Sequence, residues 1–180
     1  PKHTLLMTKD YINFKLCGTR AMDVTEASSS MMLDASSRSW SSYLMELLEL
    51  PTEMLPELFE PTQVIGSIHS AAANATGLPI GLPVIAGMGD YPAALAGSGA
   101  DPTCEACDIT GTASLITCFG QAPIIDANVM NIATADGNWG AFTMVDAAGD
   151  SIRWAQQQLS GGQHSFADIT QAVLKTQPCA

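Results

Sequence analysis

The sequence predicts a mixed α/β protein, on two observations. Short apolar runs typical of buried strands alternate with segments whose apolar residues recur at helical spacing. Hydrophobic residues make up 47% of the 180 residues, which is enough for a sizeable core and argues against disorder. The predicted elements follow one another without an internal repeat, so the chain is expected to have an α/β or α+β architecture.

The beginning of the chain is expected to be helical. Residues 4–16 carry apolar side chains at helical spacing, and Gly18 follows as a stop signal. Residues 23–33 form a second predicted helix, and residues 40–48 a third. The third helix has five apolar residues on one face: Trp40, Tyr43, Leu44, Leu47 and Leu48.

Prolines at positions 51, 56 and 61 then indicate a loop-rich segment. Residues 64–68 follow as a predicted short strand. Residues 70–76 form a predicted helix, which Gly77 ends in the manner of a C-cap.

The most informative segment is the apolar run at residues 83–87, which is typical of a strand buried on both faces. The run leads into Met88-Gly89-Asp90, and a helix of small residues follows. In open α/β sheets, ligands bind at the carboxyl ends of strands, and glycines let a substrate approach the backbone. Asp90 is therefore either the N-cap of the helix or a base that takes a proton from a hydroxyl group, and both roles can hold at once.

Beyond Pro102, a plausible domain boundary, strands are predicted near 107–109, 114–119 and 141–145, with helices at 151–159 and 166–174. The Gly111-Thr112 turn between the first two strands exposes N–H groups that can hold phosphate oxygens, although such a turn is usually only a turn.

Gly149 precedes the first closing helix and can bring a ligand near that helix N-terminus. The alternative is a plain capped helix with Trp154 packed in the core.

Charge and cysteine content exclude several classes of protein. Seven basic and 18 acidic residues give a net charge of −11, which argues against binding to nucleic acid or anionic membranes. No apolar run approaches the ~20 residues that span a bilayer, and the first residues do not form a signal peptide. A cytoplasmic protein with reduced thiols is therefore expected. Cys104 and Cys107 lack two further zinc ligands, so a metal or redox module is the minor alternative.

Short motifs carry a resemblance to a known family from about residue 5 to residue 160. They are Lys9-Asp10-Tyr11, Leu16-Cys17-Gly18, Asp23, Glu26-Ala27-Ser28, Leu33-Asp34, Trp40, Leu55-Pro56, Gly66, Ala72, Thr76-Gly77-Leu78, Gly81, Pro83-Val84, Gly87, Gly89-Asp90, Ala93-Ala94, Gly97, Gly99, Gly111-Thr112 and Ser151-Ile152-Arg153-Trp154. In this order they resemble the FGGY family of carbohydrate kinases, and most closely its xylulokinase-like members. Each motif is short, and the ordered series is the signal.

The resemblance implies an actin-like fold of two RNase H-like α/β domains with a cleft between them. It places residues 1–100 at the end of the sugar-binding N-terminal domain and residues 101–180 at the start of the nucleotide-binding C-terminal domain. The implied activity is ATP-dependent phosphorylation of a sugar hydroxyl, on a ketopentose such as xylulose or a related sugar or polyol. ATP and Mg²⁺ are the implied cofactors, and a homodimer is the implied assembly.

Residue by residue, Asp90 matches the family's catalytic base and Tyr91 the next, sugar-contacting position, where an amide or acidic side chain is common. Gly111 and Thr112 match a turn that contacts the ATP phosphates. The less secure matches are Gly149 and Arg153 on the nucleotide side, and no residue is expected to ligate a metal.

The family's N-terminal phosphate loop and its glycine-rich adenosine motif are not found in the chain. The resemblance therefore implies a fragment of a kinase, inactive by itself, or a decayed relative. A non-catalytic α/β domain that binds a sugar or a partner protein is the alternative, and Tyr91 favours it. Val24 stands where glycerol kinases place a substrate-binding Tyr, which argues against glycerol.

Overall fold

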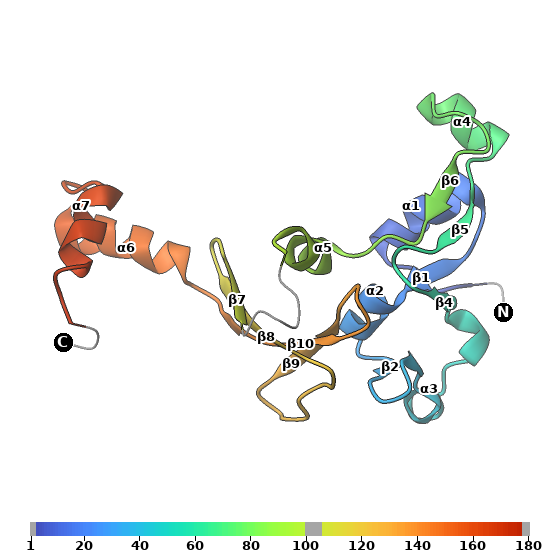
Figure 1. The fold of residues 1–180 in the computed structure, drawn as a ribbon, viewed down its shortest axis with the longest axis horizontal. Helices are drawn as coiled ribbons and strands as arrows, with labels where there is room; N and C mark the ends of the chain where they lie inside the picture. The colour runs from blue at the N-terminus through green and yellow to red at the C-terminus, as the bar shows by residue number, and fades with distance from the viewer. Residues whose placement is uncertain (1–2, 100–105, 178–180) are drawn as a thin grey trace. The chain divides into compact units, whose positions relative to one another are not determined.

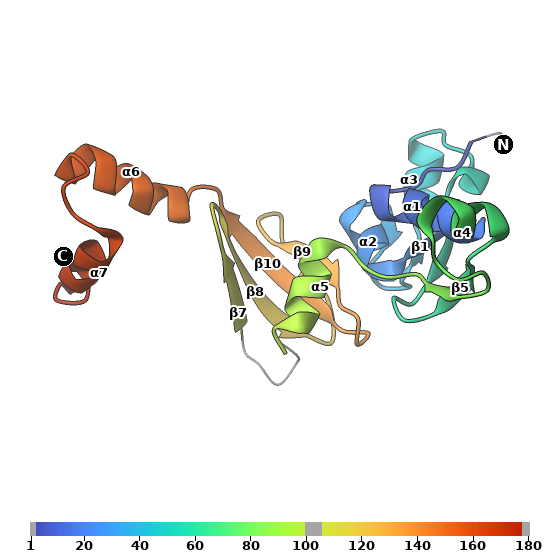
Figure 2. The same cartoon turned by 90° about the horizontal axis from the view of Figure 1, so that it is seen from above.

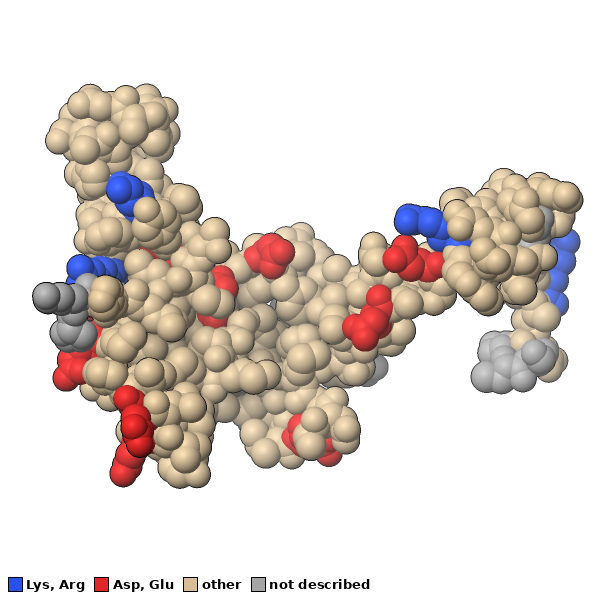
Figure 3. All heavy atoms as spheres, turned by 180° about the vertical axis from the view of Figure 1, so that it is seen from behind, with Lys and Arg blue, Asp and Glu red and all other residues tan. Residues whose placement is uncertain are grey.

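The computed structural model describes residues 3–99 and 106–177 (Figure 1). They form two compact units, one of residues 3–99, 106–107 and 118–142 and the other of residues 108–117 and 143–177. Within the described ranges, no helix is both long and apolar enough to cross a membrane. The face drawn in Figure 3 carries few charged side chains, in keeping with a charged fraction of 14%.

The first unit opens with α1 (Thr8–Cys17), β1 (Ala21–Asp23) and α2 (Val24–Ser29). The C-cap of α1 is Gly18, at φ 81°, a left-handed conformation that glycine adopts without steric cost. The side chain of Asp23 accepts hydrogen bonds from the N–H groups of Thr25 and Glu26 and so caps α2. Both predicted helices are confirmed, in shorter form.

The segment after α2 contains short elements. Strand β2 (Leu33–Asp34) pairs antiparallel with β3 (Ser39–Trp40), and α3 (Ser42–Leu47) follows. The predicted helix over residues 40–48 is confirmed in shorter form, with Trp40 in β3 instead. Its apolar face is not buried: Tyr43 and Leu47 are 71% and 62% exposed, and the residue that α3 buries is Met45.

A 3₁₀ turn (Thr52–Met54) leads into β4 (Glu57–Phe59), which pairs parallel with β1. Strand β5 (Val64–Ser67), helix α4 (Ser70–Thr76) and strand β6 (Pro83–Ile85) follow. Helix α4 has the bounds that the sequence predicts. Figure 2 shows α4 beside α1.

The prediction of a strand buried on both faces is wrong for β6. Val84 is buried, whereas Pro83 and Ile85 are exposed, because β6 pairs antiparallel with β5 in a two-stranded sheet that is covered on one face. The buried core of this region is Ala21, Ile65, Ile68, Ala72, Val84 and Ala86.

Helix α5 (Asp90–Gly97) precedes a four-stranded sheet. Its strands are β7 (Ala106–Thr110), β8 (Ser114–Gly120), β9 (Met130–Ala133) and β10 (Trp139–Val145), in the order β7-β8-β10-β9. Helix α2 packs against β9, where the N–H of Ala133 donates to Ser28 Oγ at 2.9 Å. Three of these strands were predicted, and β9 was not.

The second unit ends in α6 (Gly149–Ser160) and α7 (Phe166–Val173), close to their predicted bounds. Ser165 and Asp168 form a capping box at the start of α7. The prediction that Trp154 packs in the core is wrong. Its side chain is 60% exposed, since none of the α6 and α7 residues whose burial the structure describes is fully buried.

Candidate functional site

Asp90 lies directly after the loop that leaves β6. The N-cap of α5 is Gly89, in extended conformation at φ −63° and ψ 168°, and Asp90 is the first helical residue. The interpretation of Asp90 as the N-cap is therefore wrong, because its own backbone is already helical. Its carboxylate is exposed, and Oδ1 accepts a hydrogen bond from the N–H of Tyr91 at 2.7 Å.

Hydrogen bonds from two directions hold the loop before Asp90. The carbonyl of Ala86 accepts from Asn13 Nδ2 at 2.8 Å and from Lys9 Nζ at 3.0 Å, both on α1. The N–H of Ala86 donates to the carbonyl of Gln63 at 2.9 Å, and the N–H of Gly87 donates to the carbonyl of Pro61 at 2.8 Å. The backbone that carries Asp90 is thus anchored before the helix begins.

A buried charge cluster lies at one side of this loop. Lys9 Nζ is 2.5 Å from Asp10 Oδ1 and 3.0 Å from Asp23 Oδ2, and both carboxylates are fully buried. Burial lowers the pKa of Lys9, but the two carboxylates outweigh it and the net pKa is raised. Burial raises the pKa of Asp10, and Lys9 opposes that rise. The cluster ties α1 to the start of α2.

Glu26 brings a further carboxylate to the loop. A Cβ built on Gly89 would lie 3.0 Å from Glu26 Oε2, so the side chain of Glu26 reaches the residue before Asp90. Burial raises the pKa of Glu26, opposed by Lys9 and reinforced by nearby carboxylates that include Asp90. Sequence reasoning gave Lys9 and Glu26 no role beyond their place in motifs.

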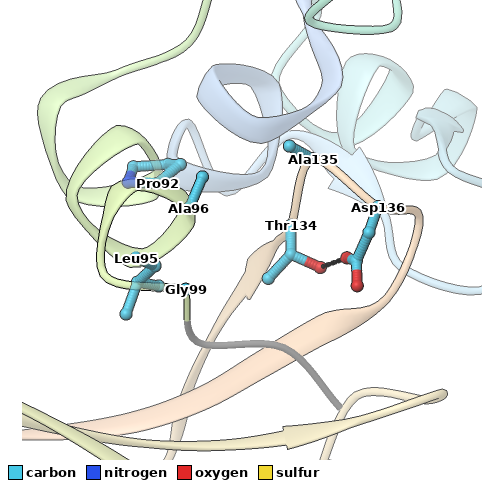
Figure 4. Close-up of a pocket in the computed structure, with 7 residues that line it drawn as sticks. All are labelled: Pro92, Leu95, Ala96, Gly99, Thr134, Ala135 and Asp136. Atoms are coloured by element: carbon cyan, nitrogen blue, oxygen red, sulfur yellow. Dashed lines mark hydrogen bonds between the residues drawn. The ribbon is translucent and has the colours of Figure 1, made fainter. Parts of the chain in front are cut away.

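Tyr91 packs its ring against Phe142 of β10, with the centroids 5.3 Å apart and the planes at 55°. The next turn of α5 lines a cavity of about 270 Å³ (Figure 4). Its residues are Pro92, Leu95, Ala96, Gly99, Thr134, Ala135 and Asp136. Thr134 donates a hydrogen bond to Asp136 there. Neither Asp90 nor Tyr91 lines this cavity, so it is separate from the predicted sugar site.

The predicted phosphate turn lies in the second unit. Gly111 and Thr112 are exposed between β7 and β8, and the N–H of Gly149 donates to the carbonyl of Gly111 at 3.1 Å. A Cβ on Gly149 would lie 2.3 Å from that carbonyl oxygen and 3.8 Å from the nitrogen of Thr112. The structure thus brings together three of the four residues predicted on the nucleotide side.

Arg153, the fourth, lies one turn further along α6. Its guanidinium is exposed and forms an ion pair with Asp150 at 3.2 Å. At the base of the turn, the hydroxyls of Ser114 and Thr110 donate to Asp108 at 2.6 and 2.7 Å and lower the pKa of that carboxyl.

The cysteine pair can be followed only in part, because Cys104 lies outside the described residues. Cys107 is a half-buried free thiol whose Sγ lies 3.9 Å from Ser98 Oγ. Among residues 3–99 and 106–177, no group of three His, Cys, Asp or Glu side chains is placed to hold a metal ion.

Comparison with known proteins decides the family. Residues 2–97 match the N-terminal domain of the FGGY family of carbohydrate kinases. The chain belongs to this family. L-fuculokinase of Escherichia coli K12 is 36% identical over 99 residues, which are 55% of this chain and 21% of the relative. Xylulose kinase of Klebsiella pneumoniae is 27% identical over 154 residues, or 84% of this chain and 32% of the relative.

Solved structures of FGGY kinases have the same fold. Xylulose kinase from Rhodospirillum rubrum superposes with a TM-score of 0.82 at 27% identity, over 93% of this chain and 34% of that one. Gluconate kinase from Lactobacillus acidophilus superposes with a TM-score of 0.82 at 24% identity, over 96% of this chain and 35% of that one. The predicted actin-like α/β fold is confirmed. The FGGY chain spans between a fifth and a third of the length of the curated relatives cited above.

Proposed function

We propose that this chain is the central part of an ATP-dependent sugar kinase and that Asp90 is its general base. The observation that carries the proposal is the placement of Asp90: an exposed carboxylate on an anchored glycine loop at the end of a strand. Residues 1–100 would end the sugar-binding domain and residues 101–180 would begin the nucleotide-binding domain. The family match, which ends at residue 97, supports this division.

The proposed reaction makes one bond and breaks one. The sugar hydroxyl oxygen attacks the γ-phosphorus of ATP, the bond from that phosphorus to the β–γ bridging oxygen breaks, and ADP leaves. Asp90 accepts the hydroxyl proton as the new bond forms. Little else is required of the protein beyond positioning, so the anchored loop is the feature that matters most.

Tyr91 is proposed to contact the sugar beside Asp90. Its ring is already held by Phe142, so it offers an aromatic face and a hydroxyl group where the family commonly has an amide or acid. A ketopentose such as xylulose, or a related sugar or polyol, is the proposed substrate class. A cytoplasmic location and a homodimer stay predictions.

On the nucleotide side, the Gly111-Thr112 turn is proposed to bind phosphate oxygens through the backbone N–H of Thr112, because the N–H of Gly111 already donates to the carbonyl of Ala113 at 2.7 Å. Gly149 packs against the turn. Arg153 would add a positive charge nearby. Mg²⁺ is proposed to arrive with ATP. The described residues form no metal-ligand group, so no step of this chain's chemistry is assigned to the ion.

The test uses the full-length protein that carries this chain, in a coupled ADP-release assay with xylulose, fuculose, gluconate and glycerol. Asp90→Asn is expected to lower kcat by about 10²-fold or more, because the base is lost. Asp126→Asn, at an exposed turn, is the matched control and should leave kcat unchanged.

Near wild-type turnover of Asp90→Asn would contradict the base assignment. ADP release from none of the sugars would contradict the kinase proposal and favour a non-catalytic sugar- or protein-binding domain.

A further inference from the structure

We propose that Lys9 is a positioning residue, which acts on the reaction through Asp90 by fixing the carbonyl of Ala86 at the start of the base-carrying loop. The inference rests on the proposed function of Asp90. It concerns a side chain that is far from Asp90 in sequence and lies on a different element.

The ammonium group of Lys9 contacts three elements. Nζ donates hydrogen bonds to Asp10 Oδ1 at 2.5 Å and to the carbonyl of Ala86 at 3.0 Å. It also forms an ion pair with Asp23 Oδ2 at 3.0 Å, a buried oxygen that accepts no hydrogen bond within the described part of the chain. The three oxygens belong to α1, to the N-cap of α2 and to the loop after β6. Lys9 therefore joins three elements at one atom.

The burial of its partners fixes Lys9 in place. Both carboxylates are fully buried, and the Lys9 side chain is 22% exposed. A buried carboxylate that loses its cation is strongly destabilised, so Lys9 cannot turn away to solvent without cost. The ion pairs with the two carboxylates do not require Lys9 to contact Ala86 as well. Because Lys9 Nζ also donates to the carbonyl of Ala86, the immobilised ammonium group holds the loop in place.

Two glycines, Gly87 and Gly89, lie between the anchored carbonyl of Ala86 and Asp90, so this part of the loop is not rigid by itself. Gly87 has φ 73°, and Gly89 forms the N-cap of α5 in extended conformation. Glycine has wide backbone freedom, so the position of Asp90 depends on where the loop is held. The stem of Lys9 also follows the loop, since a Cβ built on Gly87 would lie 3.6 Å from Lys9 Cδ.

Asn13 provides an internal comparison. Its Nδ2 donates to the same carbonyl of Ala86 at 2.8 Å, but it is neutral and no ion pair involves it. A change at Asn13 thus weakens the anchor and leaves the charge cluster intact.

The experiment measures kcat by ADP release in the full-length protein for Lys9→Met, Asp90→Asn and the double variant, with the sugar that the wild-type protein turns over. Lys9→Met is expected to lower kcat by about tenfold to a hundredfold, the loss expected for a misplacement of about 1 Å, with the KM for ATP unchanged. In the Asp90→Asn background the same change is expected to lower kcat by less than about twofold, because groups that act as a unit are not additive. Lys15→Met, exposed on the same helix, is the control.

Unchanged kcat in Lys9→Met would overturn the inference. An equal loss in both backgrounds would also overturn it, because a merely structural role lowers kcat whether or not the base is present. Full activity of Asp90→Asn is a different result, which removes the proposed base itself. If Lys9→Met does not fold, Asn13→Ala takes its place in the same cycle. It is expected to give a smaller loss with the same non-additivity, and equal losses in the two backgrounds would overturn the proposal.

Discussion

Replacing Gly149 by alanine is expected to disrupt the close approach between the start of α6 and the β7–β8 turn. A Cβ at this position would lie 2.3 Å from the carbonyl oxygen of Gly111, and real Cβ contacts essentially never fall below 3.0 Å. The two segments must therefore move apart by about 0.7 Å. The obstacle is backbone, which cannot rotate aside as a flexible side chain can.

The expected destabilisation combines two losses and one gain. Overpacking of this kind costs roughly 1–3 kcal/mol. The hydrogen bond from the Gly149 N–H to the Gly111 carbonyl, now 3.1 Å, would lengthen or break, at a net cost of about 1 kcal/mol. Alanine stabilises a helix interior by up to about 1 kcal/mol relative to glycine, and by less at the first helical position, where Gly149 lies. The sum predicts a loss of about 1–4 kcal/mol.

Urea denaturation with an unchanged m-value measures the effect, and amide hydrogen exchange at Gly149 reports the hydrogen bond directly. Gly111→Ala is the matched control, since a Cβ there meets nothing within 4 Å. It should change the free energy of unfolding by no more than about 0.5 kcal/mol, the usual range for a surface change. Equal stability of Gly149→Ala and the wild type, or equal losses in the two variants, would refute the reasoning.

Two further predictions concern the first unit. Gly66→Ala should cost about 1–3 kcal/mol by urea denaturation, because its Cβ would lie 2.9 Å from Cys17 Cβ, while Gly97→Ala, in open space, should be neutral or slightly stabilising. Hydrogen bonds from Ser36 and Ser37 lower the pKa of Asp34 from its usual value of 3.8 to about 2. The ionised carboxylate therefore stabilises the fold fully at a pH above 3.8, and this stabilisation is lost as the pH falls from 3.8 to about 2. The double change Ser36→Ala and Ser37→Ala should raise that pKa toward 3.8 in an NMR titration, and an unchanged value would contradict the assignment.

Local signals in the sequence predicted local structure well. Gly18 and Gly77 end α1 and α4 in the left-handed conformation, at φ 81° and 76°, as their positions after helical patterns indicate. Strands β1 and β4 were missed because each has only three residues and is defined by its pairing with the other, Ala21 with Glu57, across a long stretch of chain. Periodicity cannot detect so short a strand.

In the candidate site too, local features could be predicted from the sequence and long-range contacts could not. The position of Asp90 after a strand and between glycines could be read from the sequence, whereas its anchoring could not. Lys9 and Asn13 reach the carbonyl of Ala86 over 77 and 73 positions. Such contacts depend on how α1 packs on the β5–β6 region, which no local pattern specifies.

The surroundings of Asp90 and of the Gly111-Thr112 turn are built on different physical principles. The loop before Asp90 contacts a buried charge cluster through Lys9, so a change of charge at Lys9 should disturb the loop more than a change of volume. The Gly111-Thr112 turn is held through the absence of side chains, so added volume at Gly149 should harm it more than a change of charge. This second arrangement suits a protein of net charge −11 that is proposed to bind an anionic nucleotide. Backbone N–H groups aimed at phosphate oxygens attract locally, where the field of the whole chain would repel.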